Sequence, residues 1–186
     1  MERLSELEGV VLGMLGSMGP MTAYSIRQFF LKSPSPQWAS SAGTIYPLVQ
    51  RLDKRGMIRS ERHATGRREG LKYTLAPPGL KALKSWIGPE LPAIATAVPV
   101  DSLRVRVRFM SVLPEKDRIS MLKNARRELT AILKSMEKES VEKRSDKDIG
   151  LNMAYRGVIM MTKTRLAWIA EVEREFMKAG QKSKRA

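Results

Sequence analysis

The chain has 186 residues, which is enough for one domain with an appendage or for two small domains. Its 34 lysines and arginines against 19 aspartates and glutamates give a net charge of +15, which favours an anionic partner such as nucleic acid or an anionic membrane surface. Since there is no cysteine, disulfides, thiolate metal sites and thiol catalysis are excluded.

The first two predicted helices have clear start and stop signals. Ser5 and Glu8 form an S-x-x-E capping box, and Gly19-Pro20 ends the helix that follows. Thr22 can cap a second helix. Three apolar residues of this second helix are predicted to face inward: Ile26, Phe29 and Phe30. The segment "KSPSPQW" is predicted to be a loop that places Trp38 in the core.

The next predicted helix has one apolar face and one polar face. The apolar residues recur at i, i+3, i+4 and i+7: Ile45, Leu48, Val49 and Leu52. The opposite face carries Thr44, Tyr46, Pro47, Gln50, Arg51 and Lys54. Because proline is tolerated only in a first turn, Pro47 places the helix start near Gly43 or Thr44, with Ser40 and Ser41 as the approach and a possible cap. Gly56 is predicted to end the helix in a left-handed conformation.

Two short strands and a helix complete the N-terminal part. "MIRSERH" and "LKYTL" are predicted strands, joined by "ATGRREG" as a hairpin with Arg67 and Arg68 at a cationic tip. The segment "APPGLKALKSWIG" is a predicted helix, and three of its side chains are expected to face inward: Leu80, Leu83 and Ile87. Three helices followed by a two-stranded wing and a further helix are typical of a winged helix-turn-helix.

The second half is predicted to be a bundle of long helices. A short helix is expected over Asp101–Leu113 and a long one from Pro114, with a seam of apolar residues: Leu122, Ala125, Leu129, Ile132, Leu133 and Met136. A second long helix, about Leu151 to Met177, carries residues that share one side: Ala154, Val158, Met161, Trp168, Val172 and Phe176. The surplus apolar surface indicates another subunit. The predicted organisation is therefore mainly α: a winged helix-turn-helix over 1–88, a linker over 89–100, a helical dimerisation domain over 101–178 and a basic tail over 179–186.

Three segments, "VVLGMLGSMGPMTAYSIRQFF", "GTIYPLVQRLDKRGMI" and "GRREGLKYTLAPPGLKAL", closely resemble the PadR family of bacterial transcriptional regulators. The resemblance implies an N-terminal winged helix, a C-terminal helical dimerisation region, double-stranded DNA with a palindromic operator as partner, and a cytoplasmic location. One departure is Ala23, where the family often has glycine.

The resemblance also implies which residues contact DNA. On the predicted recognition helix, Thr44, Tyr46, Pro47, Gln50, Arg51 and Lys54 could reach bases or phosphates, with Ser41 at its approach. Arg67 and Arg68 at the wing tip could enter the minor groove, and Lys72 could flank a phosphate. Tyr24 and Ser25, at the start of the second helix, could meet the DNA backbone.

The residue types also bear on other functions, namely catalysis, membrane binding, and binding of protein or RNA. His63 is the only histidine, which excludes a His-based triad or two-His metal site within one subunit. Glu137, Glu139 and Glu142 alternate with lysines, so surface i,i+4 pairing explains them better than catalysis. A membrane-surface role is not expected, because Trp168 and the methionines share the stripe of a helix–helix contact. A winged helix that binds protein or RNA remains the alternative. We expect no enzyme activity, no cofactor and no metal.

The expected regulator is a homodimeric repressor that responds to a small molecule. Many relatives respond to small aromatic or cationic compounds, and Trp168 with its neighbour Met161 could line such an effector site. Plain packing is the simpler role for both residues, so the effector region rests on analogy alone.

Overall fold

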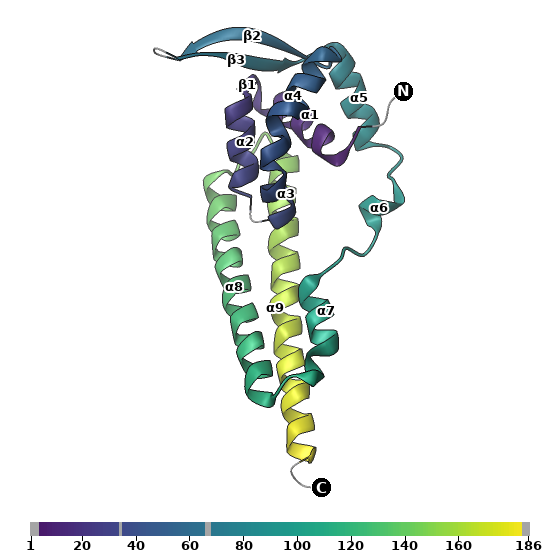
Figure 1. The fold of residues 1–186 in the computed structure, drawn as a ribbon, viewed down its shortest axis with the longest axis vertical. Helices are drawn as coiled ribbons and strands as arrows, with labels where there is room; N and C mark the ends of the chain where they lie inside the picture. Colours follow the sequence, from purple (N-terminus) through teal and green to yellow (C-terminus); the bar gives the residue numbers. More distant parts are fainter. Residues whose placement is uncertain (1–3, 34, 66–67, 184–186) are drawn as a thin grey trace. The chain divides into compact units, whose positions relative to one another are not determined.

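The computed structural model describes residues 4–33, 35–65 and 68–183. The chain divides into two compact units, residues 1–98 and residues 99–186, and each is described by itself. The first unit contains helices and a small antiparallel sheet, and the second contains long helices (Figure 1). The predicted fold class, a winged helix followed by long C-terminal helices, is confirmed.

The first unit follows the predicted order of elements, with three additions. Its elements are α1 (Glu6–Met18), β1 (Met21–Thr22), α2 (Ala23–Leu31), α3 (Pro36–Ser41), the 3-10 turn η1 (Ala42–Thr44), α4 (Ile45–Lys54), β2 (Ile58–Thr65), β3 (Arg68–Leu75), α5 (Pro77–Ile87) and α6 (Ala93–Thr96). Two of the additions are β1, which extends the two-stranded wing to the order β1-β3-β2, and α6, within the predicted linker; the third is α3 with η1, in the segment predicted to be a loop. All strand pairs are antiparallel.

Local sequence signals set the helix ends as predicted. The capping box of Ser5 and Glu8 is present at α1, and the Thr22 hydroxyl accepts from the Ser25 N–H at α2. At the end of α4, Gly56 has φ +66°, and its N–H donates to the Asp53 carbonyl over 2.8 Å. The Met57 N–H donates to the Leu52 carbonyl over 3.0 Å, so the helix ends in a Schellman motif, which fixes the direction of the chain into β2.

A dense apolar core holds the first unit together. The apolar face of α4 is buried as predicted, because Ile45, Leu48, Val49 and Leu52 are at most 3% exposed. They pack with Val11 and Leu12 of α1, Ile26 and Phe30 of α2, and Ile58 of β2. Each fully buried side chain of this kind contributes about 1.5–3 kcal/mol, so this core holds α4 in place while its other face stays in solvent.

Three predictions in the first unit are wrong. The Pro/Ser segment is not only a loop, since Pro36 begins α3 and Trp38 packs from that helix against Phe30, with ring centroids 5.7 Å apart. Phe29 is 47% exposed rather than inward. In α5 the inward residues are Gly79, Ala82 and Leu83, whereas Leu80 and Ile87 are exposed, because small residues allow the helix to approach the core more closely on that side.

The second unit consists of a short helix and two long ones. Its elements are α7 (Ser102–Phe109), the 3-10 turn η2 (Met110–Val112), α8 (Glu115–Glu142) and α9 (Ile149–Ser183). Figure 1 shows α8 and α9 side by side along most of α8. Their core contains Met110, Leu122, Leu129, Ile169 and Val172, with Trp168 and Phe176 packed against it. The seam predicted for α8 is therefore correct at Leu122, Leu129 and Met136.

The inward face of α9 agrees with the prediction at Trp168, Val172 and Phe176. It differs at Ala154, Val158 and Met161, which are exposed. Thr162 and Ile169 are buried, whereas Val158 is 40% and Met161 64% exposed. The prediction passed over Thr162 because its side chain is polar. The Thr162 hydroxyl donates to the Val158 carbonyl over 2.8 Å, and this hydrogen bond allows the residue to be buried. Val158 and Met161 consequently lie on a face that this subunit leaves open.

Candidate nucleic-acid interface

The polar face of α4 is an exposed surface on a firmly held helix. Six residues at its start and along its outer side are exposed: Thr44, Tyr46, Pro47, Gln50, Arg51 and Lys54. Tyr46 is 45% exposed and the Arg51 side chain is 55% exposed. A hydroxyl, a phenol, an amide and two cations therefore stand together on one helix face, and these are the groups that hydrogen-bond to base edges and phosphates.

A buried ion pair connects this helix to α1. Glu8 is 6% exposed, and its Oε1 lies 2.9 Å from Nη1 of Arg55 and 3.4 Å from Nη2 of Arg51. Burial opposes ionisation of the Glu8 carboxyl, but hydrogen bonds from the Ser5 N–H and hydroxyl and the charges of Arg55 and Arg51 outweigh burial and lower its pKa. The carboxylate is thus ionised at neutral pH and fixes the C-terminal part of α4.

Arg55, at the C-terminal end of α4, is mostly covered and pairs with Glu8. Its side chain is only 20% exposed and is held by Glu8. Arg51 lies farther from the same carboxylate and keeps most of its surface in solvent, so it remains available to an external anion. Sequence reasoning missed the pair because Glu8 and Arg55 are 47 positions apart, and no local pattern links them.

The start of α4 is arranged differently from the predicted serine cap. Ser41 lies inside α3, is half-buried, and its hydroxyl donates to the Gln37 carbonyl over 2.9 Å. The Thr44 hydroxyl donates to the Ser41 carbonyl over 2.8 Å and makes no capping bond to α4. The cap is not needed because α3, η1 and α4 follow one another without an extended residue between them. Both hydroxyl oxygens can still accept a hydrogen bond.

The start of α2 presents a second polar group. Tyr24 is 60% exposed, so its ring does not pack in the core. Ser25 is exposed, and its hydroxyl lies 2.9 Å from the Thr22 hydroxyl. Because the Thr22 side chain already caps the Ser25 N–H, the remaining N–H groups of the first turn are those that could meet an anion.

The wing carries cations along its strands as well as near its end. Arg68 begins β3 and pairs with Thr65 of β2 in the last pair of the ladder, next to the predicted tip, whereas Arg67 lies outside the described residues. Lys72 is half-buried and pairs with Thr22 of β1 and Glu61 of β2. Sequence reasoning missed Arg59 and Arg62, which are exposed on β2. Alternation in "MIRSERH" could have identified Arg59, which shares one side of the strand with Glu61, but not Arg62, which lies on the other side.

Within residues 4–33, 35–65 and 68–183, no group of three or more histidines or carboxylates is placed to hold a metal ion. Over the same residues, no helix is both long enough and apolar enough to cross a membrane. His63 lies within the length of β2 rather than at its end, and it pairs with Gly70 of β3. Two predicted surface pairs of α8 are present, Lys138 with Glu142 and Lys143 with Glu139, while Glu137 instead pairs with Lys163 of α9.

A three-stranded sheet beside a helix with one buried and one exposed polar face defines the first unit as a winged helix-turn-helix. Residues 11–85 match the family model described as the transcriptional regulator PadR-like family, and residues 101–176 match the model described as the virulence activator alpha C-terminal region. No match was found among curated proteins.

Solved structures share this fold at low sequence identity. PadR of Bacillus subtilis in complex with operator DNA has a TM-score of 0.76 at 20% identity, covering 90% of this chain and 97% of its own. The same protein in complex with p-coumaric acid has a TM-score of 0.69 at 19% identity, covering 89% and 92%. The virulence activator AphA of Vibrio cholerae has a TM-score of 0.66 at 17% identity, covering 94% and 99%. Residues 11–85 of the first unit therefore form a domain of the PadR-like family of transcriptional regulators.

Proposed function

We propose that this protein is a dimeric transcriptional regulator that binds a specific double-stranded DNA site through its winged helix. The observation that carries the proposal is the exposed polar face of α4, which is held rigidly by the buried face and by Glu8. A helix presented in this way fits the major groove, where hydrogen-bond groups distinguish base pairs. The similar fold of Bacillus subtilis PadR, solved with operator DNA, supports this assignment.

The proposed contacts divide into base readers and phosphate contacts. Thr44, Pro47 and Gln50 are proposed to read base edges, since an amide can pair with adenine and an apolar group can contact the thymine methyl. The proposed phosphate contacts come from α2, α3, α4 and β3, together with Arg67, which lies outside the described residues: Tyr24, Ser25, Ser41, Tyr46, Arg51, Lys54, Arg67, Arg68 and Lys72. Arg59 and Arg62 are added to this group because they are exposed on the same wing.

The proposed dimer forms through the second unit. Met153, Gly157, Met160 and Thr164 recur at steps of three and four along α9, on the side away from buried Thr162 and Ile169. Met160 is 58% exposed and Met161 64% exposed. A second copy that covers this face removes the apolar surface from water, and two recognition helices then reach half-sites about one turn apart on a palindromic operator.

We further propose repression by occlusion of a promoter and a response to a small molecule. The sign of regulation is tested by transcription in vitro, because one structurally similar protein is an activator. Of the effector residues predicted from the sequence, Trp168 packs against the core of the second unit, while Met161 is exposed. A DNA-bound regulator acts where the chromosome lies, so the proposal includes a cytoplasmic location in a bacterium.

The test is selection of bound fragments from the source genome, followed by titration of the selected duplex. If four or five of the proposed cationic contacts per subunit each neutralise one phosphate, the log of the association constant should fall with log salt at a slope of about −7 to −9 for the dimer. Gln50→Ala should cost about 1–3 kcal/mol on the selected site and relax the preference at one base pair.

Arg62→Ala is the matched control, since it should weaken all duplexes equally and reduce the salt slope by about 1. If neither variant changes binding, or if single-stranded RNA competes as well as the duplex, the proposal is wrong. The second outcome would favour the alternative of an RNA-binding winged helix.

A further inference from the structure

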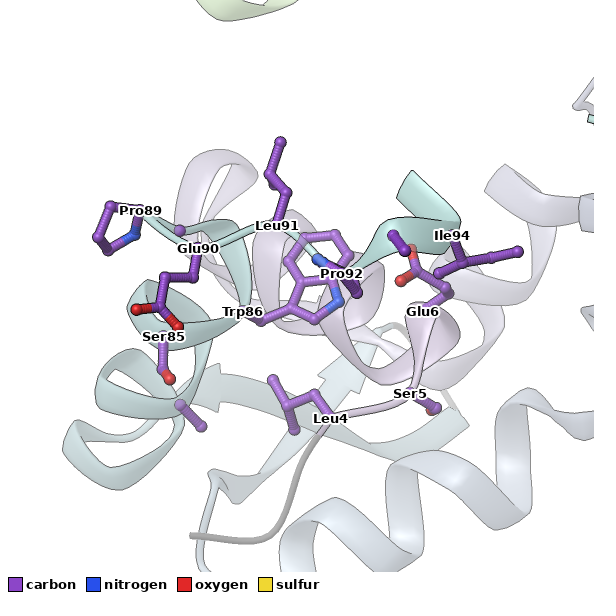
Figure 2. Close-up of a pocket in the computed structure, with 13 residues that line it drawn as sticks. Leu4, Ser5, Glu6, Ser85, Trp86, Pro89, Glu90, Leu91, Pro92 and Ile94 are labelled. Carbon is purple, nitrogen blue, oxygen red and sulfur yellow. The ribbon is translucent and has the colours of Figure 1, made fainter. Parts of the chain in front are cut away.

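A pocket of about 1040 Å³ lies in the first unit, away from the polar face of α4. Its walls are residues 4–6 at the start of α1, the last turns of α5, and residues 88–94 after α5 (Figure 2). Its volume is in the range of sites that bind small organic molecules. Neither the proposed DNA contacts nor the proposed dimer face uses any of these residues.

The indole of Trp86 is fixed at the centre of this pocket. A Cβ atom placed on Gly9 of α1 would lie 2.3, 2.5 and 2.8 Å from three atoms of the six-membered ring of Trp86. Because all three distances are short, Gly9 lies beneath the face of the ring, and only glycine leaves room for this contact. The ring is therefore packed against α1 and does not need a ligand to be placed.

Two carboxylates lie in the lining, Glu6 at the start of α1 and Glu90 in the segment after α5. Glu6 and Glu90 are exposed, and in Figure 2 the indole of Trp86 lies between them in projection. Among the residues that the structure describes, neither carboxylate has a hydrogen bond or an ion pair. Among the described residues that line the pocket there is no lysine and no arginine, although the chain has 34 of them. The described part of the lining is thus acidic on a strongly basic protein.

We propose that this pocket binds a small organic cation that has an aromatic or quaternary ammonium part. A cation near an indole face gains about 0.5–2 kcal/mol, and carboxylates on its flanks add Coulomb attraction. Leu4 and Leu91 in the lining supply apolar contact for the rest of the molecule. An aromatic anion such as p-coumarate is disfavoured by the same two carboxylates.

The occupied pocket has a consequence for the chain that leaves it. Residues 88–94 form part of the wall and lead to the second unit. A bound cation would contact this segment and restrict its conformations. Binding is therefore expected to change the range of conformations of the segment that joins the two units. That consequence rests on the proposed function, whereas binding of the cation does not, because it is measured without DNA.

The test is isothermal titration calorimetry of the full chain with benzyltrimethylammonium, in the absence of DNA. We expect binding that weakens as salt is raised, and at least about tenfold weaker binding for benzyl alcohol and p-coumarate. The double variant E6Q/E90Q should lose about tenfold in affinity. Glu61→Gln removes an exposed carboxylate on β2 and serves as the matched control, with unchanged affinity.

A second measurement locates the bound probe. The indole N–H resonance of Trp86 should shift on titration, while those of Trp38 and Trp168 should not. Thermal unfolding of E6Q/E90Q establishes that the variant is folded. The proposal is overturned by unchanged affinity in the folded double variant, by a shift at Trp168 instead of Trp86, or by no binding up to about 10 mM probe.

Discussion

The two units bury their apolar residues to very different extents. In residues 1–98, the apolar faces of α1, α2 and α4 meet in one core, where Val11, Leu12, Ile26 and Val49 are fully buried. In residues 99–186, α7, α8 and α9 share a smaller core, and α9 leaves its methionines exposed. A helix pair can cover only one stripe on each helix, so the first unit should be stable alone while the second should depend on a partner.

The largest expected effect is in the closed core of the first unit. Leu52 is fully buried on α4. Leu52→Ala should lower the free energy of unfolding by about 2–5 kcal/mol through lost burial and a residual cavity. Denaturant unfolding should give the same change at every protein concentration, whereas a concentration-dependent change would mean that the first unit also relies on a partner.

The buried residues of α4 could be predicted from the sequence because the helix offers a single apolar stripe. Only one apolar stripe exists in "IYPLVQRLDK", and its four members are all buried. In α5, Leu83 belongs to two possible stripes, and the sequence favoured the one with larger side chains. Packing selected Gly79 and Ala82 instead, because close approach was more favourable than burying Leu80 or Ile87.

The candidate site divides in a similar way. The exposed face of α4 follows from helical periodicity, so its residues could be predicted from the sequence. The pairing of Arg68 with Thr65 depends on the register of β2 and β3. The glycines near Arg68 in the sequence indicate a turn but do not determine that register. The pairing of Glu8 with Arg55 depends on tertiary structure alone, and β1, with two residues, is too short to leave a pattern.

The buried ion pair should produce the next largest effect in the first unit. Glu8→Gln removes the carboxylate that lies 2.9 Å from Nη1 of Arg55, and we expect a loss of about 2 kcal/mol in the free energy of unfolding, below the full cost for a buried pair because the Arg55 side chain is 20% exposed. The exposed pair of Glu128 and Arg127 is the control, and Glu128→Gln should cost less than about 0.5 kcal/mol. Equal losses in both variants would contradict a structural role for Glu8.

The same pair predicts a pH dependence. The pKa of Glu8 lies below 4.5 in the folded chain, because hydrogen bonds from Ser5 and the charges of Arg55 and Arg51 outweigh the effect of burial. A lowered pKa contributes stability above the unfolded value, and that contribution is lost as the pH falls through the folded value. The difference in unfolding free energy between wild type and Glu8→Gln should therefore be constant near neutral pH and narrow below 4.5.

The open face of α9 should respond through assembly rather than folding. Met160 and Met161 are both exposed in one subunit. The double change M160K/M161K should raise the dimer dissociation constant at least about 100-fold, equivalent to about 2.7 kcal/mol, because it places charges in an apolar interface. Sedimentation equilibrium measures the constant, with Arg174→Ala, an exposed position on the same helix, as the control. An unchanged dimer would assign the interface to another face.

The smallest expected effect is at the ion pair between the two long helices. Arg126 of α8 pairs with Glu173 of α9, but the two side chains are 47% and 21% exposed. In solvent, the Coulomb gain is offset by screening and by the entropy of holding two long side chains, so Arg126→Ala should cost no more than about 0.5 kcal/mol. Thermal unfolding of the wild type and the variant at high and low salt measures this loss of stability. A larger and salt-independent loss would mean that the pair is covered by a second subunit, which would place Glu173 at the dimer interface.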